Sequence, residues 1–421
     1  MALAACAAGA SASCVLQAGV ACAQGEKQAG GRGREPEGKA LGGAPAREEA
    51  DREETEQGKR NGALAPRAGN EPQALFEKAL DLAFGRGVAK NQARARALYE
   101  RAARGGHVEA MLHLGAMMMR GRGGPRRPEA ALAWYRRAAE RGDARGAYAL
   151  GAAYESGRGA PADPVQARRW YERSAALGSP RANAALGWLY ERAWGVPRDL
   201  ERARTLYEEA ARGGDREGMA RLARLCAEGL GGPRDEVKAL ALWARAADEG
   251  HVPSMLRMAE RLRRGGGVLR RDPALAARWL HRAARAGSPR GMRLWGEALL
   301  EGVGTEARPA EGRRWLLRAA EAGDGPAATR AARCLLDGVG GPCRPERAVG
   351  LLLQAAEAQD AHALFLLGRL SERGEAGLDR DPETAARWYR RALAAGHPEA
   401  AAALDALGAP VDPGGGKAEE R

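Results

Sequence analysis

One pattern recurs along this chain at intervals of 36 or 37 residues. In each copy a small residue stands four positions before a large one, and a small pair stands three and four positions after it. The large residues are Tyr99, Tyr135, Tyr171, Tyr207, Trp243, Leu280, Leu316, Leu352 and Tyr389. Because positions three and four apart share one face of a helix, each copy predicts a helix whose small residues let a neighbouring helix approach closely.

A second helix is predicted before each of these helices. Its mark is a large residue followed by a small one, as at Leu114–Gly115, Leu150–Gly151 and Leu186–Gly187. Glycine inside a helix costs about 1 kcal/mol relative to alanine, so its recurrence indicates that a partner packs where a Cβ would clash. The chain is therefore predicted to be an all-α protein, an α-solenoid forming a right-handed superhelix. It has about nine helix-turn-helix repeats and a C-terminal capping helix over 398–409.

Stop and start signals lie between the predicted helices. Gly142–Asp143 places a glycine, which tolerates left-handed backbone, before a residue that caps the next helix. Asp163–Pro164 opens a helix in the same way, because proline lacks the N–H that the first turn leaves unpaired. Pro398 is expected at the first position of the last helix. Departures from the pattern are Trp194, placed in a glycine column of the turn, Gln359 where glycine is expected, and an irregular turn at 374–381.

Residues 143–179 read DARGAYALGAAYESGRGAPADPVQARRWYERSAALGS. The segment resembles the Sel-one-like repeat (SLR) family, a relative of the tetratricopeptide repeat, and the likeness extends over residues 72–408. The resemblance implies a non-catalytic scaffold or adaptor that binds another protein and helps to assemble or regulate a multiprotein complex. Family roles include degradation adaptors of the endoplasmic reticulum, chitin-synthase activation and bacterial host-interaction or envelope signalling. The sequence does not choose among them.

The two ends of the chain differ from the repeats. Residues 1–70 are Ala-rich at 1–23 and then rich in Gly, Pro and charge, and residues 410–421 are similar. Both ends lack the large apolar residues needed to offset ordering entropy, so disorder is expected. The expected location is the cytoplasm. The alternative, a secreted, ER or organellar protein, applies if residues 1–23 are a cleaved targeting peptide, because Ala-Cys-Ala before Gln24 resembles a cleavage site.

A net charge of +13, carried almost entirely by Arg, raises the alternative of nucleic-acid or anionic-surface binding. The run Trp134, Tyr135, Arg136, Arg137 could join a stacking platform to a phosphate clamp. However, the run is one copy of the repeat, and Glu and Asp alternate with Arg along most of the array. Nucleic acid is therefore the weaker reading.

No catalytic, cofactor-binding or metal-binding residue is predicted, and the chain is expected not to be an enzyme. The glycine turns lack the Lys-Ser/Thr pair of a phosphate-binding loop, and His107, His251 and His397 fall at expected helix starts. Cys226 is expected in the core and Cys343 on the surface. Some bacterial SLR proteins are associated with β-lactam hydrolysis, the least favoured alternative, because the regular cysteine pairs of those proteins are absent here.

What remains as a candidate site is the concave surface formed by the first helix of each repeat. If its geometry follows tetratricopeptide repeats, the residue after each large–small pair and the residue three positions later face a groove. We expect a peptide or helix of a partner protein to bind there. The candidate residues are Trp188, Glu191, Trp194, Arg224, Glu260, Arg263, Glu297, Arg333 and Arg369. Trp188 and Arg224 are the first residues to substitute in a test of this groove, because Trp and Arg are common in binding hot spots.

Overall fold

In the computed structural model, residues 71–409 are described and consist of α-helices joined by short turns. The first helices of the repeats are α3 (Glu71–Phe84), α5 (Val108–Arg120), α7 (Ala144–Ser156), α9 (Pro180–Arg192), α11 (Arg216–Glu228), α13 (Val252–Arg264), α15 (Pro289–Glu301), α17 (Gly325–Leu336) and α19 (Ala361–Arg373). The second helices are α4 (Gln92–Arg104), α6 (Pro128–Glu140), α8 (Pro164–Ala176), α10 (Leu200–Arg212), α12 (Glu236–Asp248), α14 (Pro273–Arg285), α16 (Pro309–Glu321), α18 (Pro345–Glu357) and α20 (Pro382–Ala394). A short helix, α21 (Ala400–Ala406), follows. The predicted nine helix pairs and terminal cap are confirmed, and the handedness of the superhelix stays a prediction.

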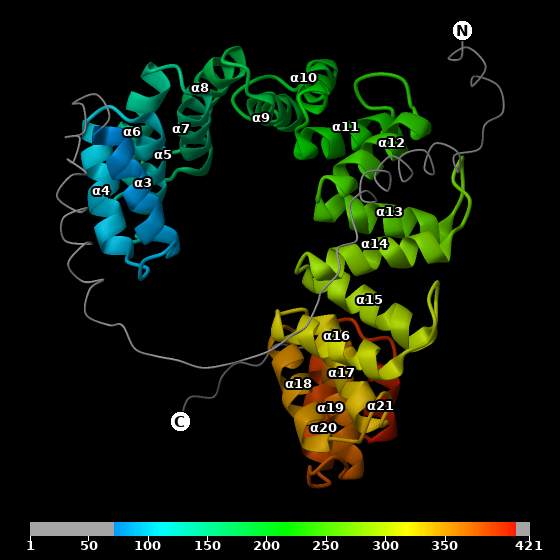
Figure 1. The fold of residues 1–421 in the computed structure, drawn as a ribbon. Helices are drawn as coiled ribbons and strands as arrows, with labels where there is room; N and C mark the ends of the chain where they lie inside the picture. The colour runs from blue at the N-terminus through cyan, green and yellow to red at the C-terminus, as the bar shows by residue number, and fades with distance from the viewer. Residues whose placement is uncertain (1–70, 410–421) are drawn as a thin grey trace, which may run out of the picture. The chain divides into compact units, whose positions relative to one another are not determined.

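Two compact units divide the described chain, an N-terminal unit of residues 71–234 and a C-terminal unit of residues 235–409. Within each unit, successive helices pack side by side, first against second and then against the next first helix (Figure 1). The expected disordered segments 1–70, with the targeting candidate 1–23, and 410–421 lie outside the described residues. Between residues 71 and 409, no helix combines the length and the apolar character that a membrane crossing requires.

The repeated tyrosines and glycines form the predicted knob-and-hole contacts. A Cβ on Gly115 would lie 2.5 Å from Cε1 of Tyr135, a distance that no real Cβ tolerates. The same contact joins Gly187 to Tyr207 and Gly368 to Tyr389. Tyr207 and Tyr389 are almost completely buried. The glycine lets each second helix press its large residue against the backbone of the first helix, so the interpretation of both columns is confirmed.

Helix boundaries follow the stop and start signals read from the sequence. Gly142 has a φ of 82°, and Asp143 caps α7 by accepting hydrogen bonds from the amides of Arg145 and Gly146. Asp163 caps α8 in the same way ahead of Pro164. At the irregular positions Gln359 and Ala376, non-glycine residues adopt a left-handed φ of 57° and 60°.

Two details of the sequence interpretation are wrong. Trp194 does not occupy the glycine column, because the left-handed C-cap of α9 is Ala193, with a φ of 55°. Trp194 instead aligns with Arg158, the residue after the corresponding C-cap glycine. Pro398 does not open the last helix, because Glu399 is the N-cap residue of α21.

The aromatic-basic run at 134–137 belongs to the packing of α6. Trp134 and Tyr135 are both buried, at 9% and 8% exposure, so neither ring is available as a stacking platform. The guanidinium of Arg137 stacks over the Trp134 ring at 4.7 Å. Arg282 over Trp279 and Arg391 over Trp388 repeat this arrangement. The run is therefore a structural ridge.

Arginines on three second helices reach into the turn of the following repeat. Arg96 donates to the carbonyl oxygen of Pro125 at 3.0 Å, and Arg204 and Arg313 make the same bond to Pro233 and Pro342. Each acceptor proline ends a Gly-Gly-Pro turn. A Cβ on the second of these glycines would collide with the arginine, as at Gly124, where Arg96 Nη1 would lie 2.8 Å away.

Candidate protein-binding groove on the first helices

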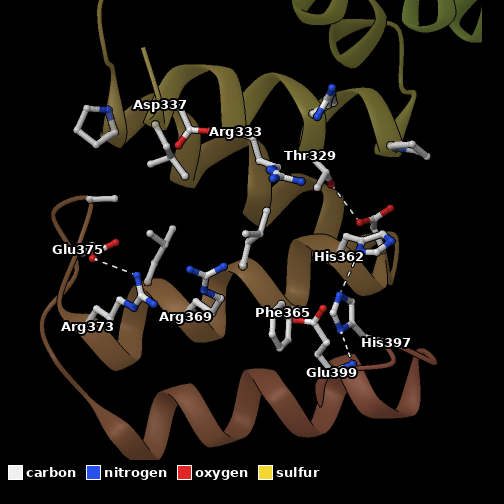
Figure 2. Close-up of a pocket in the computed structure, with 18 of the residues that line it drawn as sticks. Thr329, Arg333, Asp337, His362, Phe365, Arg369, Arg373, Glu375, His397 and Glu399 are labelled. Carbon is white, nitrogen blue, oxygen red and sulfur yellow. Dashed lines mark hydrogen bonds and ion pairs between the residues drawn. The ribbon is translucent and has the colours of Figure 1, made fainter. Parts of the chain in front are cut away.

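A groove of about 890 Å³ lies on the C-terminal unit. First helices supply most of its lining, one residue from α15 and several each from α17 and α19, and residues 397–399 ahead of α21 close one end (Figure 2). The first-helix surface of the solenoid is thus hollowed where the sequence analysis expected a binding face.

The capping chemistry of α19 fixes the helices on either side of this groove. Asp360 is the N-cap residue of α19 and accepts a hydrogen bond from the Ala363 amide at 2.8 Å. The hydroxyl of Thr329 on α17 donates to the same oxygen of Asp360 at 3.1 Å (Figure 2). One carboxylate therefore ends a helix and joins it to its neighbour, which sets the spacing between α17 and α19.

Four arginines line the groove, and only two of them are paired within the described residues. Arg330 forms an ion pair with Glu301 at 2.8 Å, and Arg373 forms one with Glu375 at 3.7 Å. Arg333 and Arg369 are exposed, and neither forms an ion pair with any residue between 71 and 409. They occupy equivalent positions on adjacent first helices, with their side chains at the centre of the groove (Figure 2).

The N-terminal unit shows why these two arginines lack partners. There Arg224, the equivalent residue of α11, binds Glu191 at 2.7 Å, and Glu191 precedes it by 33 residues. The residues 33 positions before Arg333 and Arg369 are Leu300 and Leu336. Leucine has replaced the internal carboxylate in both repeats, so the guanidinium groups face the groove uncompensated.

Apolar side chains lie among the arginines. Leu336 and Leu366 are half-buried, whereas Leu370 and Phe365 are buried. Their contacts belong to the cluster that holds α17 to α20 together. The groove thus offers hydrophobic surface and cationic hydrogen-bond donors side by side.

A histidine pair forms the end of the groove next to α21. His397 Nε2 lies 3.0 Å from His362 Nδ1, while His397 Nδ1 accepts a hydrogen bond from the Glu399 amide at 3.3 Å. Because Nδ1 of His397 accepts, its Nε2 carries the ring proton and donates a hydrogen bond to Nδ1 of His362. The ring of His397 also stacks on Phe365, with centroids 4.1 Å apart. Burial, and then the neighbouring His362, lowers the pKa of His397.

Acidic residues lie mainly around the groove's edge. Glu297 is bound to Arg293 at 3.2 Å, and Glu375 is bound to Arg373. Asp337 lies at one end of the groove and Glu399 at the other, beside the histidines (Figure 2). The positive charge without an internal counter-ion is therefore concentrated at the centre.

The other predicted site residues are placed differently. Trp188 and Trp194 are half-buried and contact each other, with ring centroids 6.3 Å apart. Glu191 accepts a hydrogen bond from the Tyr207 hydroxyl at 2.8 Å and also binds Arg224, which in turn binds Glu228. Burial and the Glu191 charge raise the pKa of Tyr207. Glu191 and Arg224 are thus engaged within the N-terminal unit.

Two further predicted residues lie on α13 in the C-terminal unit. Glu260 forms an ion pair with Arg264 at 3.1 Å, and Arg263 is exposed. Neither lines the groove, whereas Glu297, Arg333 and Arg369 do. Three of the nine predicted residues therefore converge on the groove.

Sequence reasoning missed several residues of the groove, among them Phe365, His362, Arg330 and Arg373. His397 comes 35 residues after His362, which is close to one repeat length, so the period could have predicted that the two side chains are neighbours. A second available signal was Leu300 and Leu336, which stand at the position of Glu191 in the copies at 289–324 and 325–360.

Two other histidines lie at helix starts, and the cysteines lie in the core or at the surface. His107 caps α5 through Nδ1, which accepts from the Ala110 amide at 3.2 Å, and His251 is the N-cap residue of α13. Cys226 is buried and Cys343 is exposed, as expected. Within residues 71–409, no three acidic, histidine or cysteine side chains gather in a way that could hold a metal ion.

Stacked helix pairs with a knob-and-hole seam and a groove on the first helices define a protein of the tetratricopeptide-like solenoid class. The Sel1 repeat pattern matches nine consecutive segments, 74–107, 108–143, 144–179, 180–215, 216–251, 252–288, 289–324, 325–360 and 361–397. The chain belongs to the Sel1 repeat family. Repeats of this kind generally mediate protein–protein interaction and are generally non-catalytic.

One solved structure of a similar protein has the same fold, and a second is similar in sequence over about half of the chain. A protective antigen of uropathogenic Escherichia coli with an SLR fold is 27% identical, with a TM-score of 0.55 over 81% of this chain and 74% of that chain. A Sel1 repeat protein from Oxalobacter formigenes is 30% identical over 52% of this chain and 88% of that chain, with a TM-score of 0.49. Nothing among the curated proteins matches.

Proposed function

We propose that this protein is a non-catalytic scaffold or adaptor, and that the groove on α15, α17 and α19 binds a segment of a partner protein. The observation that carries the proposal is the pair Arg333 and Arg369, which lie at the centre of a groove of about 890 Å³ and form no ion pair with any residue between 71 and 409. Exposed arginine beside buried aromatic and aliphatic residues is typical of binding hot spots. Binding would bring the partner into a larger complex.

The groove is favoured over the tryptophan pair of the N-terminal unit for an energetic reason. Trp188 and Trp194 already bury part of their surface against each other and against the cluster around Leu186. Arg224 would have to exchange an existing ion pair for one with the partner, whereas Arg333 and Arg369 would not. A ligand therefore gains more from the groove than from the residues that sequence reasoning ranked first.

Position-specific photocrosslinking in the full chain tests this proposal. Benzoylphenylalanine replaces Cys343 in one variant, Trp188 in a second and Gly350 in a third. Cys343 is exposed and lines the groove, so this variant keeps both arginines. Gly350 is exposed on α18, a second helix, and has open space where a Cβ would lie, so it is the matched control. We expect one set of proteins to crosslink at position 343 and not at position 350. Equal crosslinking at 343 and 350 would contradict a specific groove, and crosslinking confined to 188 would move the site to the N-terminal unit.

The cytoplasm is the proposed location, because the cysteines in the described residues are free thiols. Mass spectrometry of the mature N-terminus checks this proposal, and a start near Gln24 would contradict it.

A further inference from the structure

We infer that the occupant of the groove is a peptide segment in which two carboxylates alternate with apolar residues, bound through Arg333 and Arg369. This inference rests on the proposed function and adds the chemistry of the partner. Three observations carry it: the unpaired guanidinium groups, the leucines that replaced their internal partners, and the contrast with the equivalent arginine of the N-terminal unit.

The first step concerns the missing carboxylate. Glu191 shows that this position of the repeat can deliver a carboxylate oxygen to within 2.7 Å of the arginine in the next repeat. With Leu300 and Leu336 in its place, the arginine keeps its position but the chain no longer supplies the carboxylate that accepts from it. A carboxylate supplied by a ligand can complete the same contact, since guanidinium and carboxylate match in bidentate geometry.

The second step concerns the spacing of the ligand's acidic residues. Arg333 and Arg369 occupy equivalent positions on adjacent first helices, and both side chains lie at the centre of the groove. In an extended peptide, side chains two residues apart share one face and are about 7 Å apart. An extended segment with acidic residues at alternate positions can therefore present one carboxylate to each arginine, whereas a single carboxylate serves only one of them.

The third step concerns the residues between and beside the carboxylates. Leu336 and Leu366 are half-buried and line the groove next to the arginines, so apolar ligand side chains can cover them. Asp337 and Glu399 at the two ends repel further ligand carboxylates there. The acidic residues of the ligand are thus expected at its centre, and a uniformly acidic chain is a poorer fit than a mixed one.

Nucleic acid, the other polyanion that a basic surface suggests, fits these observations less well. Its phosphates repeat without interruption, and the groove presents isolated arginines bordered by leucines, Asp337 and Glu399. Within the groove, Arg330 and Arg373 are already paired with Glu301 and Glu375. A continuous positive stripe, which a phosphate backbone would follow, is not formed here.

Fluorescence polarisation with the full chain tests the inference. The probe is a fluorescein-labelled nine-residue peptide of alternating Ala and Leu with two central Glu residues two positions apart, and the control peptide carries Gln in place of both Glu. We expect the Glu peptide to bind at least tenfold more tightly than the Gln peptide. The double variant Arg333→Ala/Arg369→Ala should lose that preference, and Arg224→Ala should retain it.

A third variant, Leu336→Glu, tests the missing-carboxylate step directly. The new side chain occupies the position that Glu191 holds in the N-terminal unit, so it should bind Arg369 and weaken Glu-peptide binding by about tenfold. Circular dichroism and thermal melting on each variant exclude unfolding as the cause. Equal affinity for the Glu and Gln peptides, or unchanged binding by the double variant, would overturn the inference. If crosslinking remains specific to position 343 in the groove while the Glu preference is absent, the proposed function stands and the acidic-ligand inference fails.

Discussion

The two units of the chain share one packing scheme but use their surface arginines differently. In the N-terminal unit Arg224 is bound by Glu191 and Glu228, and Arg145 is bound by Glu109 at 3.0 Å. In the C-terminal unit Arg333 and Arg369 have no such partner within the described residues and face a groove. The same repeat position thus forms an internal ion pair in one unit and, within the described residues of the other, forms none.

A change at one other position accounts for much of this difference. A carboxylate at Glu191 closes the pair with the arginine of the next repeat, and a leucine at Leu300 or Leu336 leaves that arginine open. A single side chain one repeat away can therefore decide whether this arginine is paired internally, while the helices that position it stay the same. The arginine itself need not change.

The largest expected effect tests whether the packing scheme is the same in both units. Gly187→Ala and Gly368→Ala should each lower the free energy of unfolding by about 2–3 kcal/mol, because the new Cβ would overlap the ring of Tyr207 or Tyr389. Urea denaturation of the full chain measures the effect. Gly350→Ala, where nothing lies near the new Cβ, should instead stabilise by about 0.5–1 kcal/mol. A marked difference between the first two variants would show that the glycine–tyrosine contact contributes unequally to the stability of the two units.

The next effect concerns the internal carboxylate. Glu191→Leu should lower the free energy of unfolding by about 1–2 kcal/mol, since it removes the acceptor of the Tyr207 hydroxyl and the partner of Arg224. Glu191→Gln should recover part of this loss, because an amide oxygen still accepts from Tyr207. If Glu191→Leu is neutral in urea denaturation, Glu191 has no structural role.

A smaller effect separates the arginines themselves. Arg224→Ala should lower the free energy of unfolding by about 1 kcal/mol, discounted for the partial exposure of its side chain. Arg333→Ala and Arg369→Ala should each stay within about 0.5 kcal/mol of wild type, as is usual for unpaired surface residues. Equal losses at all three positions in thermal or urea melts would mean that the groove arginines are structural after all.

The smallest expected effect is a pH dependence of the C-terminal unit. Burial and His362 hold the pKa of His397 below its ordinary value of about 6.5. The unfolded chain therefore takes up a proton before the folded one does, so stability should fall as the pH drops below about 6.5 and level off below the folded pKa. Glu399 and Asp360 oppose the shift, which keeps the effect small. Thermal melts at pH 7.5 and 5.5 measure it, and His397→Asn should melt with a weaker dependence.

The fold could be predicted from the sequence because its constraints repeat. Tyr171 and Gly151 recur at a fixed spacing in other copies, and Asp163–Pro164 marks a helix start by local chemistry alone. Even so, Trp194 was assigned to the wrong column, because Ala193 adopts a left-handed conformation that the residue type does not announce.

The candidate site could be predicted only in part. The positions facing the groove follow from the period, which is how Arg333 and Arg369 were found. Whether a charged residue is free depends on its neighbour one repeat away, and reading one column at a time does not reveal it. Glu191 and Arg224 were therefore grouped with the groove residues although they bind each other.

The arginine bonds to the Gly-Gly-Pro turns restrict which repeats can be gained or lost without breaking them. Arg96, Arg204 and Arg313 are 108 and 109 residues apart, and Asp163–Pro164, Asp272–Pro273 and Asp381–Pro382 share a spacing of 109 residues. Both features therefore recur once in every three repeats, and three consecutive repeats make up one cassette of this pattern. Gain or loss of a whole cassette keeps every such arginine opposite a glycine pair. Deletion of the single repeat that contains Gly124 would instead set Arg96 against the turn at 159–161, where Ala160 stands in place of the second glycine and the guanidinium would have to shift.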